Sequence, residues 1–100
     1  MSLQEKLDGD RRRAILRLIS TGGESTEVIV LDVLRKTSHG FRLTRARVRA
    51  DFDWLRERHL IDVEMLGDTL MVATITDIGE EVLVNARRVA GVSAARRRDL

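Results

Sequence analysis

The side chains best suited to chemistry in this sequence are arginines, which gather in runs along the chain. All of the 18 basic residues except Lys6 and Lys36 are arginine, and they cluster at residues 11–13, 42–58, 87–88 and 96–98. A guanidinium group can form two parallel hydrogen bonds to a phosphate or to the edge of a guanine. Because acidic residues hold the net charge to +2, the placement of the arginines is more informative than their number.

The residue types that usually carry out catalysis or bind metals are sparse and poorly spaced. Cysteine is absent, and His39 and His59 have no companions at metal-ligand spacing. The pair Gly22-Gly23 is not followed by the Gly-Lys-Ser/Thr of a phosphate-binding loop. No serine, histidine and aspartate are arranged in a way that predicts a triad. We therefore expect no enzyme activity, no metal site and no cofactor.

Length and hydropathy favour one folded domain. A chain of 100 residues with 43% apolar residues can bury a single modest core. It contains no apolar run long enough to span a membrane, and no basic segment followed by an apolar block at the N-terminus. We expect a cytoplasmic protein with a domain over residues 1–92 and a flexible basic tail over residues 93–100.

Hydrophobic periodicity predicts two helices in the first part of the chain. Gly9 is expected to separate a short leading turn from a main helix at residues 10–20. A second helix is expected to begin at Ser25 or Thr26 and to end near Gly40, with a strand stub following at residues 41–43. The apolar face predicted for this second helix consists of Ile29, Val30, Val33 and Leu34.

The second part of the chain predicts a helix, a hairpin and a final helix. Thr44 is expected to cap a helix over residues 45–59, whose buried stripe is Val48, Phe52 and Leu55. Strands at residues 60–66 and 69–75 flank a two-residue turn, Gly67-Asp68, and Thr76 caps the last helix. This order predicts an α+β, mostly α winged helix-turn-helix fold, with a three-helix core, a two-stranded wing, a strand stub and a C-terminal helix.

The helix that begins after Thr44 has the face best suited to bind DNA. At about 100° per residue, Ala46 and Ala50 lie opposite the buried stripe, where small side chains allow close approach to bases. We expect this helix to enter the major groove of double-stranded DNA. The expected contacts are Thr44, Arg45, Ala46, Arg47, Arg49 and Ala50, with Arg42 just before the helix, and further phosphate contacts from Arg56, Arg96, Arg97 and Arg98. A solvated helix of mixed charge is the alternative for the same pattern.

Three other features bear on this hypothesis. The predicted wing has no basic residue at its tip and carries Asp62 and Glu64, so we expect it to contribute few phosphate contacts. Trp54 is expected to pack under the hairpin or at a subunit interface. The arginines at residues 11–13 are expected either to be solvated in the first turn of a helix or to contact phosphate.

Two segments resemble a known group of proteins. Residues 39–61, HGFRLTRARVRADFDWLRERHLI, resemble helix three and the start of the wing in small winged-helix proteins of Mu-like phages and prophages, often labelled ArsR-like regulators. Residues 74–82, TITDIGEEV, resemble the helix after the wing in that group and in MarR-type repressors. The resemblance covers roughly residues 10–92. It implies DNA binding through Arg45, Arg47 and Arg49, and a homodimer in the cytoplasm of a bacterial host cell.

The resemblance favours a phage or prophage transcriptional regulator. One alternative is a component of phage DNA packaging or assembly, which docks DNA or a phage protein partner. The other is a winged helix used only for protein–protein contact, with Trp54 and the hairpin as the interface. Metal sensing of the ArsR type is not expected, because cysteine is absent.

Overall fold

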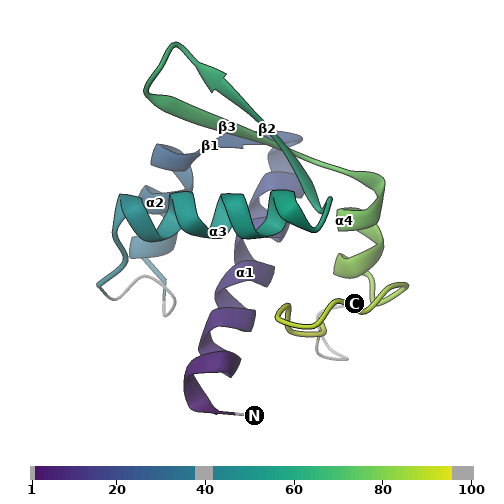
Figure 1. Ribbon diagram of the computed structural model, residues 1–100. Coiled ribbons are helices and arrows are strands. Elements are labelled where there is room, and N and C mark those ends of the chain that lie inside the picture. Colours follow the sequence, from purple (N-terminus) through teal and green to yellow (C-terminus); the bar gives the residue numbers. More distant parts are fainter. Residues whose placement is uncertain (1, 38–41, 96–100) are drawn as a thin grey trace.

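The computed structural model describes residues 2–37 and 42–95, and within them it contains four helices and a three-stranded antiparallel sheet (Figure 1). The elements are α1 (Leu3–Gly22), β1 (Glu24–Thr26), α2 (Glu27–Arg35), α3 (Arg45–Glu57), β2 (Ile61–Leu66), β3 (Leu70–Ile75) and α4 (Asp77–Leu83). The predicted α+β, mainly helical class is confirmed. No helix in the described residues is long and apolar enough to cross a membrane.

The sheet has β3 at its centre, between β1 and β2. The hairpin predicted from residues 60–75 is present, but its turn has three residues rather than two, because Leu66 pairs with Leu70 and leaves Thr69 outside the ladder. Gly67 begins the turn with φ 65°, a left-handed conformation that glycine adopts without strain. The hairpin extends beyond the helices (Figure 1).

The strand stub expected at residues 41–43 is wrong in the part that the structure describes. Arg42 lies in a turn with φ 63°, and Leu43 follows in a loop. The third strand is instead β1, which pairs antiparallel with β3 through Ser25 and Ala73. Its three residues are too few to show an alternating pattern. Gly40 and Phe41 lie outside the described residues.

Threonine and serine side chains fix where the helices begin. The hydroxyl groups of Ser2, Thr26, Thr44 and Thr76 each accept a hydrogen bond from the backbone N–H three residues later. Each bond satisfies one of the N–H groups that a helix start leaves unpaired. The predicted caps at Thr44 and Thr76 are confirmed. α3 ends at Glu57, two residues before the predicted end, because His59 adopts φ 63° and leaves the helix.

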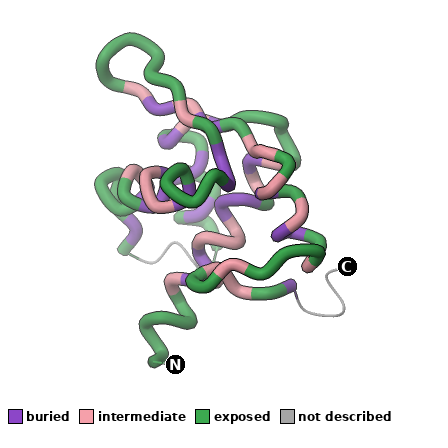
Figure 2. The backbone as a smooth tube through the Cα atoms, turned by 45° about the vertical axis from the view of Figure 1, so that its right-hand side comes forward, coloured by how far each residue is buried: buried purple, intermediate pink, exposed green. Residues whose placement is uncertain are grey.

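The core lies where the helices meet one face of the sheet, and Figure 2 shows buried residues there and exposed residues at the N-terminal turns and the hairpin end. The predicted stripe of α3, Val48, Phe52 and Leu55, is fully buried. The predicted face of α2 is partly wrong, since Leu31 is buried and Ile29 is 52% exposed. The buried residues of α2 are Glu27, Val30, Leu31 and Leu34.

α1 is continuous through Gly9, so the predicted break is wrong. Gly9 is buried because the C-terminal segment crosses α1 at this point, where the Ser93 N–H donates to the Gly9 carbonyl at 3.2 Å. A Cβ on Gly9 would lie 2.8 Å from Ser93 Oγ. The glycine therefore serves a close approach of two chain segments and does not end the helix.

The C-terminal segment is packed as far as the structure describes it. The Asn85 side chain accepts a hydrogen bond from the Ala95 N–H at 3.0 Å and donates to the Ala95 carbonyl at 3.1 Å. Ala95 is buried. The packed region thus reaches past the expected start of the tail at residue 93. Arg96, Arg97 and Arg98 lie outside the described residues.

Candidate nucleic-acid interface

The start of α3 forms an exposed surface of small and basic residues. Helix α3 crosses in front of α1 in Figure 1, with the hairpin above it. Ala46, Arg47 and Ala50 are exposed on the side opposite the buried stripe, as helical spacing predicts, and the capping residue Thr44 is exposed beside them. The Arg47 guanidinium has no hydrogen bond or ion pair to any residue that the structure describes.

Arg45 and Arg49 are both bound to one buried carboxylate, that of Glu27. Arg45 Nε donates to Glu27 Oε1 at 2.5 Å, and Arg49 Nε lies 3.3 Å from the same oxygen. A terminal nitrogen of Arg45 also donates to the Thr69 carbonyl in the hairpin turn at 2.7 Å. The two arginine side chains remain 46% and 38% exposed. The buried Glu27 therefore holds two of the arginines on the surface that helical spacing predicts.

Glu27 is buried because it takes the place of a strand residue. β1 ends at Thr26, which pairs with Val72, and one position further the Glu27 side chain accepts the Met71 N–H at 2.6 Å. Burial alone raises the pKa of Glu27, but the hydrogen bonds from Arg45 and Met71 and the charge of Arg49 outweigh it. The pKa therefore lies below its ordinary value of 4.5.

Sequence reasoning missed Glu27, although a signal was present. An acidic residue in the first turn of a helix is usually a solvated group that complements the helix dipole. Glu27, however, falls on the same stripe as Val30, Leu31 and Leu34, at spacings of three, four and seven residues. A charged residue on an apolar stripe indicates a buried partner of opposite charge.

Of the other basic residues expected at the interface, the structure describes Arg42 and Arg56. Arg42 is exposed in the turn before α3. Arg56, near the end of α3, is 52% exposed and pairs with Asp53 at 3.2 Å. Arg35 of α2 donates to the Leu43 carbonyl at 3.2 Å, which links the end of α2 to the start of α3. Basic groups from both helices thus share one corner of the molecule.

The hairpin has the opposite character. Asp62, Glu64 and Asp68 are exposed, and the segment from residue 60 to residue 76 contains no arginine or lysine. Met65 and Leu66 near the turn are 47% and 64% exposed. This surface is acidic and apolar, so it is unsuited to contact phosphate.

The chain has a relative in a well-known bacteriophage. It is 38% identical over 97 residues to the uncharacterized protein gp26 of Escherichia phage Mu, and the alignment covers 96% of this chain and 98% of that protein. The chain belongs to the family of phage Mu gp26. It is also 38% identical over 77 residues to an uncharacterized protein of Haemophilus influenzae, covering 76% of this chain and 74% of that protein. No protein-family model matches the chain, and no solved structure matches it.

In this gp26-family protein Arg11, Arg12 and Arg13 of α1 have internal partners, which corrects the expectation of solvated or phosphate-binding groups. Arg11 is buried and donates from Nε and a terminal nitrogen to the two oxygens of Asp51, at 2.5 and 2.9 Å. The hydrogen bond to Asp51 raises the pKa of Arg11 above its ordinary value, against the effect of burial. Arg13 donates to the Leu83 carbonyl at 3.1 Å. These groups join α1 to α3 and α4.

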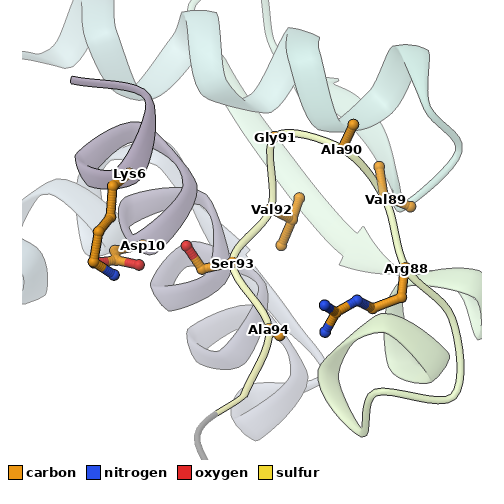
Figure 3. Close-up of a pocket in the computed structure, with 9 residues that line it drawn as sticks. All are labelled: Lys6, Asp10, Arg88, Val89, Ala90, Gly91, Val92, Ser93 and Ala94. Carbon is orange, nitrogen blue, oxygen red and sulfur yellow. The ribbon is translucent and has the colours of Figure 1, made fainter. Parts of the chain in front are cut away.

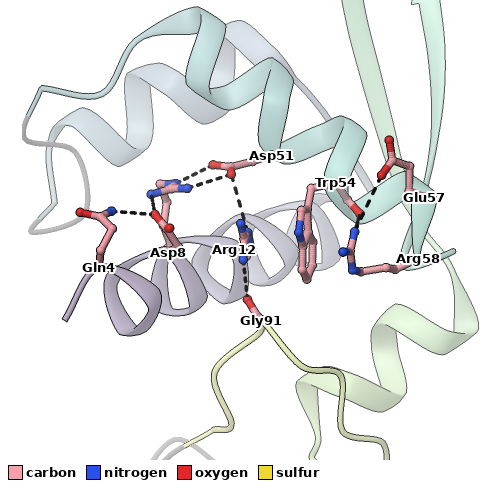
Figure 4. Close-up of polar contacts among 9 residues, drawn as sticks. Gln4, Asp8, Arg12, Asp51, Trp54, Glu57, Arg58 and Gly91 are labelled. Carbon is pink, nitrogen blue, oxygen red and sulfur yellow. Dashed lines mark hydrogen bonds and ion pairs between the residues drawn. The ribbon is translucent and has the colours of Figure 1, made fainter. Parts of the chain in front are cut away.

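Trp54 lies between two arginines rather than under the hairpin (Figure 4). The guanidinium carbons of Arg12 and Arg58 lie 4.0 and 3.5 Å from the centre of a Trp54 ring, a cation–π arrangement on both faces. Arg12 also donates to the Gly91 carbonyl at 3.0 Å. A Cβ on Gly91 would lie 2.5 Å from the indole. The stack therefore holds the C-terminal segment against α1 and α3.

A hollow of about 400 Å³ lies between the start of α1 and residues 88–94 (Figure 3). Its polar lining includes Lys6 and Asp10 of α1, whose side chains pair at 3.5 Å, and Arg88 and Ser93 of the C-terminal segment. Among the residues that the structure describes, no group of three or more histidine, aspartate or glutamate side chains could hold a metal ion. The hollow follows from the crossing of the two segments at Gly9.

Proposed function

We propose that this gp26-family protein is a winged helix-turn-helix protein that binds double-stranded DNA with the first half of α3 in the major groove. The observation that carries the proposal is the exposed face of α3, on which Ala46 and Ala50 lie among Arg45, Arg47 and Arg49. Small residues at the centre of such a face let the helix backbone approach base edges, while arginines at its border reach phosphates or guanines.

The order and pairing of the elements support this fold assignment. Two helices precede α3, a hairpin follows it, and a short strand between α1 and α2 pairs with the hairpin. The major groove is about 12 Å wide and an α-helix with its side chains is about 10–12 Å across. A helix supported by a core on one side and open on the other suits this groove.

The distribution of charge supports the orientation of the bound protein. The corner formed by the end of α2 and the start of α3 carries the exposed side chains of Arg35, Arg42 and Arg47. Lys36 in the same corner pairs with the exposed Asp32 at 3.3 Å. Exposed acidic groups lie on the hairpin and on α4, at Asp62, Glu64, Asp68, Asp77 and Glu80. An uneven charge distribution of this kind orients the basic corner toward DNA as the two molecules approach each other.

The role that best fits these features is that of a phage or prophage transcriptional regulator acting as a homodimer in the host cytoplasm. A second candidate is favoured by one observation. The hairpin end exposes Met65 and Leu66 beside acidic groups, which suits a protein partner better than DNA. In that case the chain is a component of phage DNA packaging or assembly, and the hairpin contacts another phage protein.

A titration of fluorescent duplex DNA at two salt concentrations tests the proposal. We expect binding at micromolar protein or below that weakens steeply as salt rises, because arginines that neutralise phosphates release counterions. A chain that binds no duplex at low salt, while remaining folded by circular dichroism, would show that the second candidate is the better one.

A further inference from the structure

Glu27 has a role that groove entry by α3 leaves unexplained. Its side chain is fully buried, and both of its oxygens are occupied by groups from α3 and β3. Burial of an ionised carboxylate is unfavourable unless it is paired and hydrogen-bonded. Since an apolar residue could fill this space at less cost, the charge of Glu27 indicates a use in fixing its partners.

The way in which Glu27 holds Arg49 leaves one end of that guanidinium open. The Arg49 Nε–H donates a hydrogen bond to Met71 Sδ at 3.3 Å, and the same nitrogen forms an ion pair with Glu27 Oε1 at 3.3 Å. Its two terminal nitrogens form no hydrogen bond with any residue that the structure describes, and the side chain is 38% exposed. The Nε of the guanidinium is therefore held by the protein, while its two terminal nitrogens remain available as donors.

Arg45 is held differently, between α3 and the hairpin. It donates from Nε to Glu27 and from a terminal nitrogen to the Thr69 carbonyl. Two of its three nitrogens are thus occupied inside the protein. Arg45 braces the hairpin turn against α3, and Arg49 is the arginine of the pair that remains available as a donor fork.

Resting on the proposed function, we infer that Glu27 is a positioning residue that orients Arg49 toward a pair of hydrogen-bond acceptors on DNA, the O6 and N7 atoms of a guanine in the major groove. A guanidinium fixed in advance loses little conformational freedom on binding, and its two donors match the spacing of that base edge. A phosphate also offers two acceptors, but it carries no base identity. A contact to guanine would therefore give the protein a base preference, whereas a contact to phosphate would not.

The first part of the test needs no DNA. Nitrogen-15 spectra of the arginine Nε–H groups are compared for the wild-type protein and Glu27→Gln. We expect slowly exchanging Nε protons for Arg45 and Arg49 in the wild type. In the variant we expect faster exchange at both: Arg45 loses its charged acceptor, and Arg49, whose Nε donates to Met71 Sδ, loses the ion pair that holds it there. Arg56, whose Nε lies outside this cluster, serves as the internal control. Rapid exchange of the Arg49 Nε proton in the wild type would overturn the inference.

The second part selects binding sites from randomised duplexes. We expect the wild type to enrich sites with a guanine at one position, and Arg49→Lys to lower the preference for that base about tenfold while binding unrelated duplex within about twofold. Glu27→Gln is expected to have the same effect, and the double variant no further effect, because both residues act in one contact. Arg87→Lys is the matched control and is expected to keep the wild-type preference, because Arg87 pairs with Glu81 of α4 and is not among the expected DNA contacts.

The outcomes separate this inference from the proposed function. Retention of the guanine preference by Arg49→Lys, or additive losses in the double variant, would overturn it. Equal loss of affinity for every duplex would assign Arg49 to phosphate and overturn it as well. Arg49→Lys keeps Glu27 in place, so site selection with this variant still tests the inference if Glu27→Gln fails to fold. A protein with a fixed Arg49 that binds no duplex would instead refute the proposed function itself.

Discussion

Arg11 of α1 and Asp51 of α3 form a buried ion pair joined by two hydrogen bonds, at 2.5 and 2.9 Å. Asp51 is only 2% exposed, and Asp8 contacts a third nitrogen of Arg11 at 2.8 Å. The pair fixes α1 against the side of α3 that carries the core stripe. It therefore supports the exposed face of α3 from behind.

Removal of the charge of Asp51 should be strongly destabilising. We expect Asp51→Asn to lower the free energy of unfolding by about 3–5 kcal/mol, because the buried Arg11 then loses its buried counter-charge and keeps only the less buried Asp8. The measurement is urea unfolding followed by circular dichroism. Asp53→Asn is the matched control, since the Asp53–Arg56 pair is about half exposed on both sides, and its expected change is within about 0.5 kcal/mol. Equal effects of the two substitutions would show that the buried pair contributes no more to the free energy of unfolding than the exposed pair.

Arg47 should contribute to DNA affinity without contributing to folding. We expect Arg47→Ala to weaken duplex binding and to reduce the slope of log affinity against log salt by about one, as loss of one phosphate contact does. The unfolding free energy should change by no more than about 0.5 kcal/mol. Arg87→Ala is the control, because Arg87 is also exposed but pairs with Glu81 of α4. Indistinguishable binding by the two variants would remove α3 as the contact surface.

The stability of the protein should depend on the ionisation of Glu27 in acid. Its pKa in the folded state lies below the ordinary value of 4.5, so the ionised form stabilises the fold above that value. This contribution is lost as the pH falls from about 5 through the lowered pKa. The wild type should therefore lose stability more steeply over this range than Glu27→Gln, as measured by thermal unfolding at a series of pH values. Parallel curves for the two proteins would contradict the lowered pKa.

Two glycines in helices should respond in opposite ways to alanine. A Cβ on Gly79 would overlap the Leu60 carbonyl oxygen, which belongs to the backbone, whereas a Cβ on Gly22 meets nothing within 4 Å. We expect Gly79→Ala to destabilise the fold by about 1–3 kcal/mol despite the better helix propensity of alanine. Gly22→Ala should be neutral or slightly stabilising. Thermal unfolding of both variants checks this, and a stabilised Gly79→Ala would mean that α4 can move away from Leu60.

Local patterns in the sequence were sufficient to predict the helices and the hairpin. The threonine caps and the stripe of α3 depend only on residues close in the chain, so Thr44 and Phe52 were placed correctly. The predicted helix break at Gly9 was wrong because the residue that packs against this glycine, Ser93, lies far along the chain. β1 was missed because its three residues are defined by a partner strand and not by their own pattern.

The candidate site could be predicted only as a face of a helix. Helical spacing places Arg45, Arg47 and Arg49 at the surface, and it cannot distinguish an arginine with an internal partner from one without. Glu27 and Asp51 differ from ordinary charged helix residues by lying next to apolar stripes. Their partners, Arg49 and Arg11, are many residues away, and a single sequence carries no record of which charges meet.

The acidic edge of the hairpin has a consequence for self-association. β2 is an edge strand of the sheet, and Asp62 and Glu64 are exposed along it. If two copies joined β2 to β2 in a symmetric antiparallel pair about Val63, each Asp62 would stand opposite the other copy's Glu64. Like charges facing each other across such a pair are destabilising, and exposed strand edges are commonly protected in this way. The β2 edge of the sheet is thereby guarded against pairing with a second copy in this register.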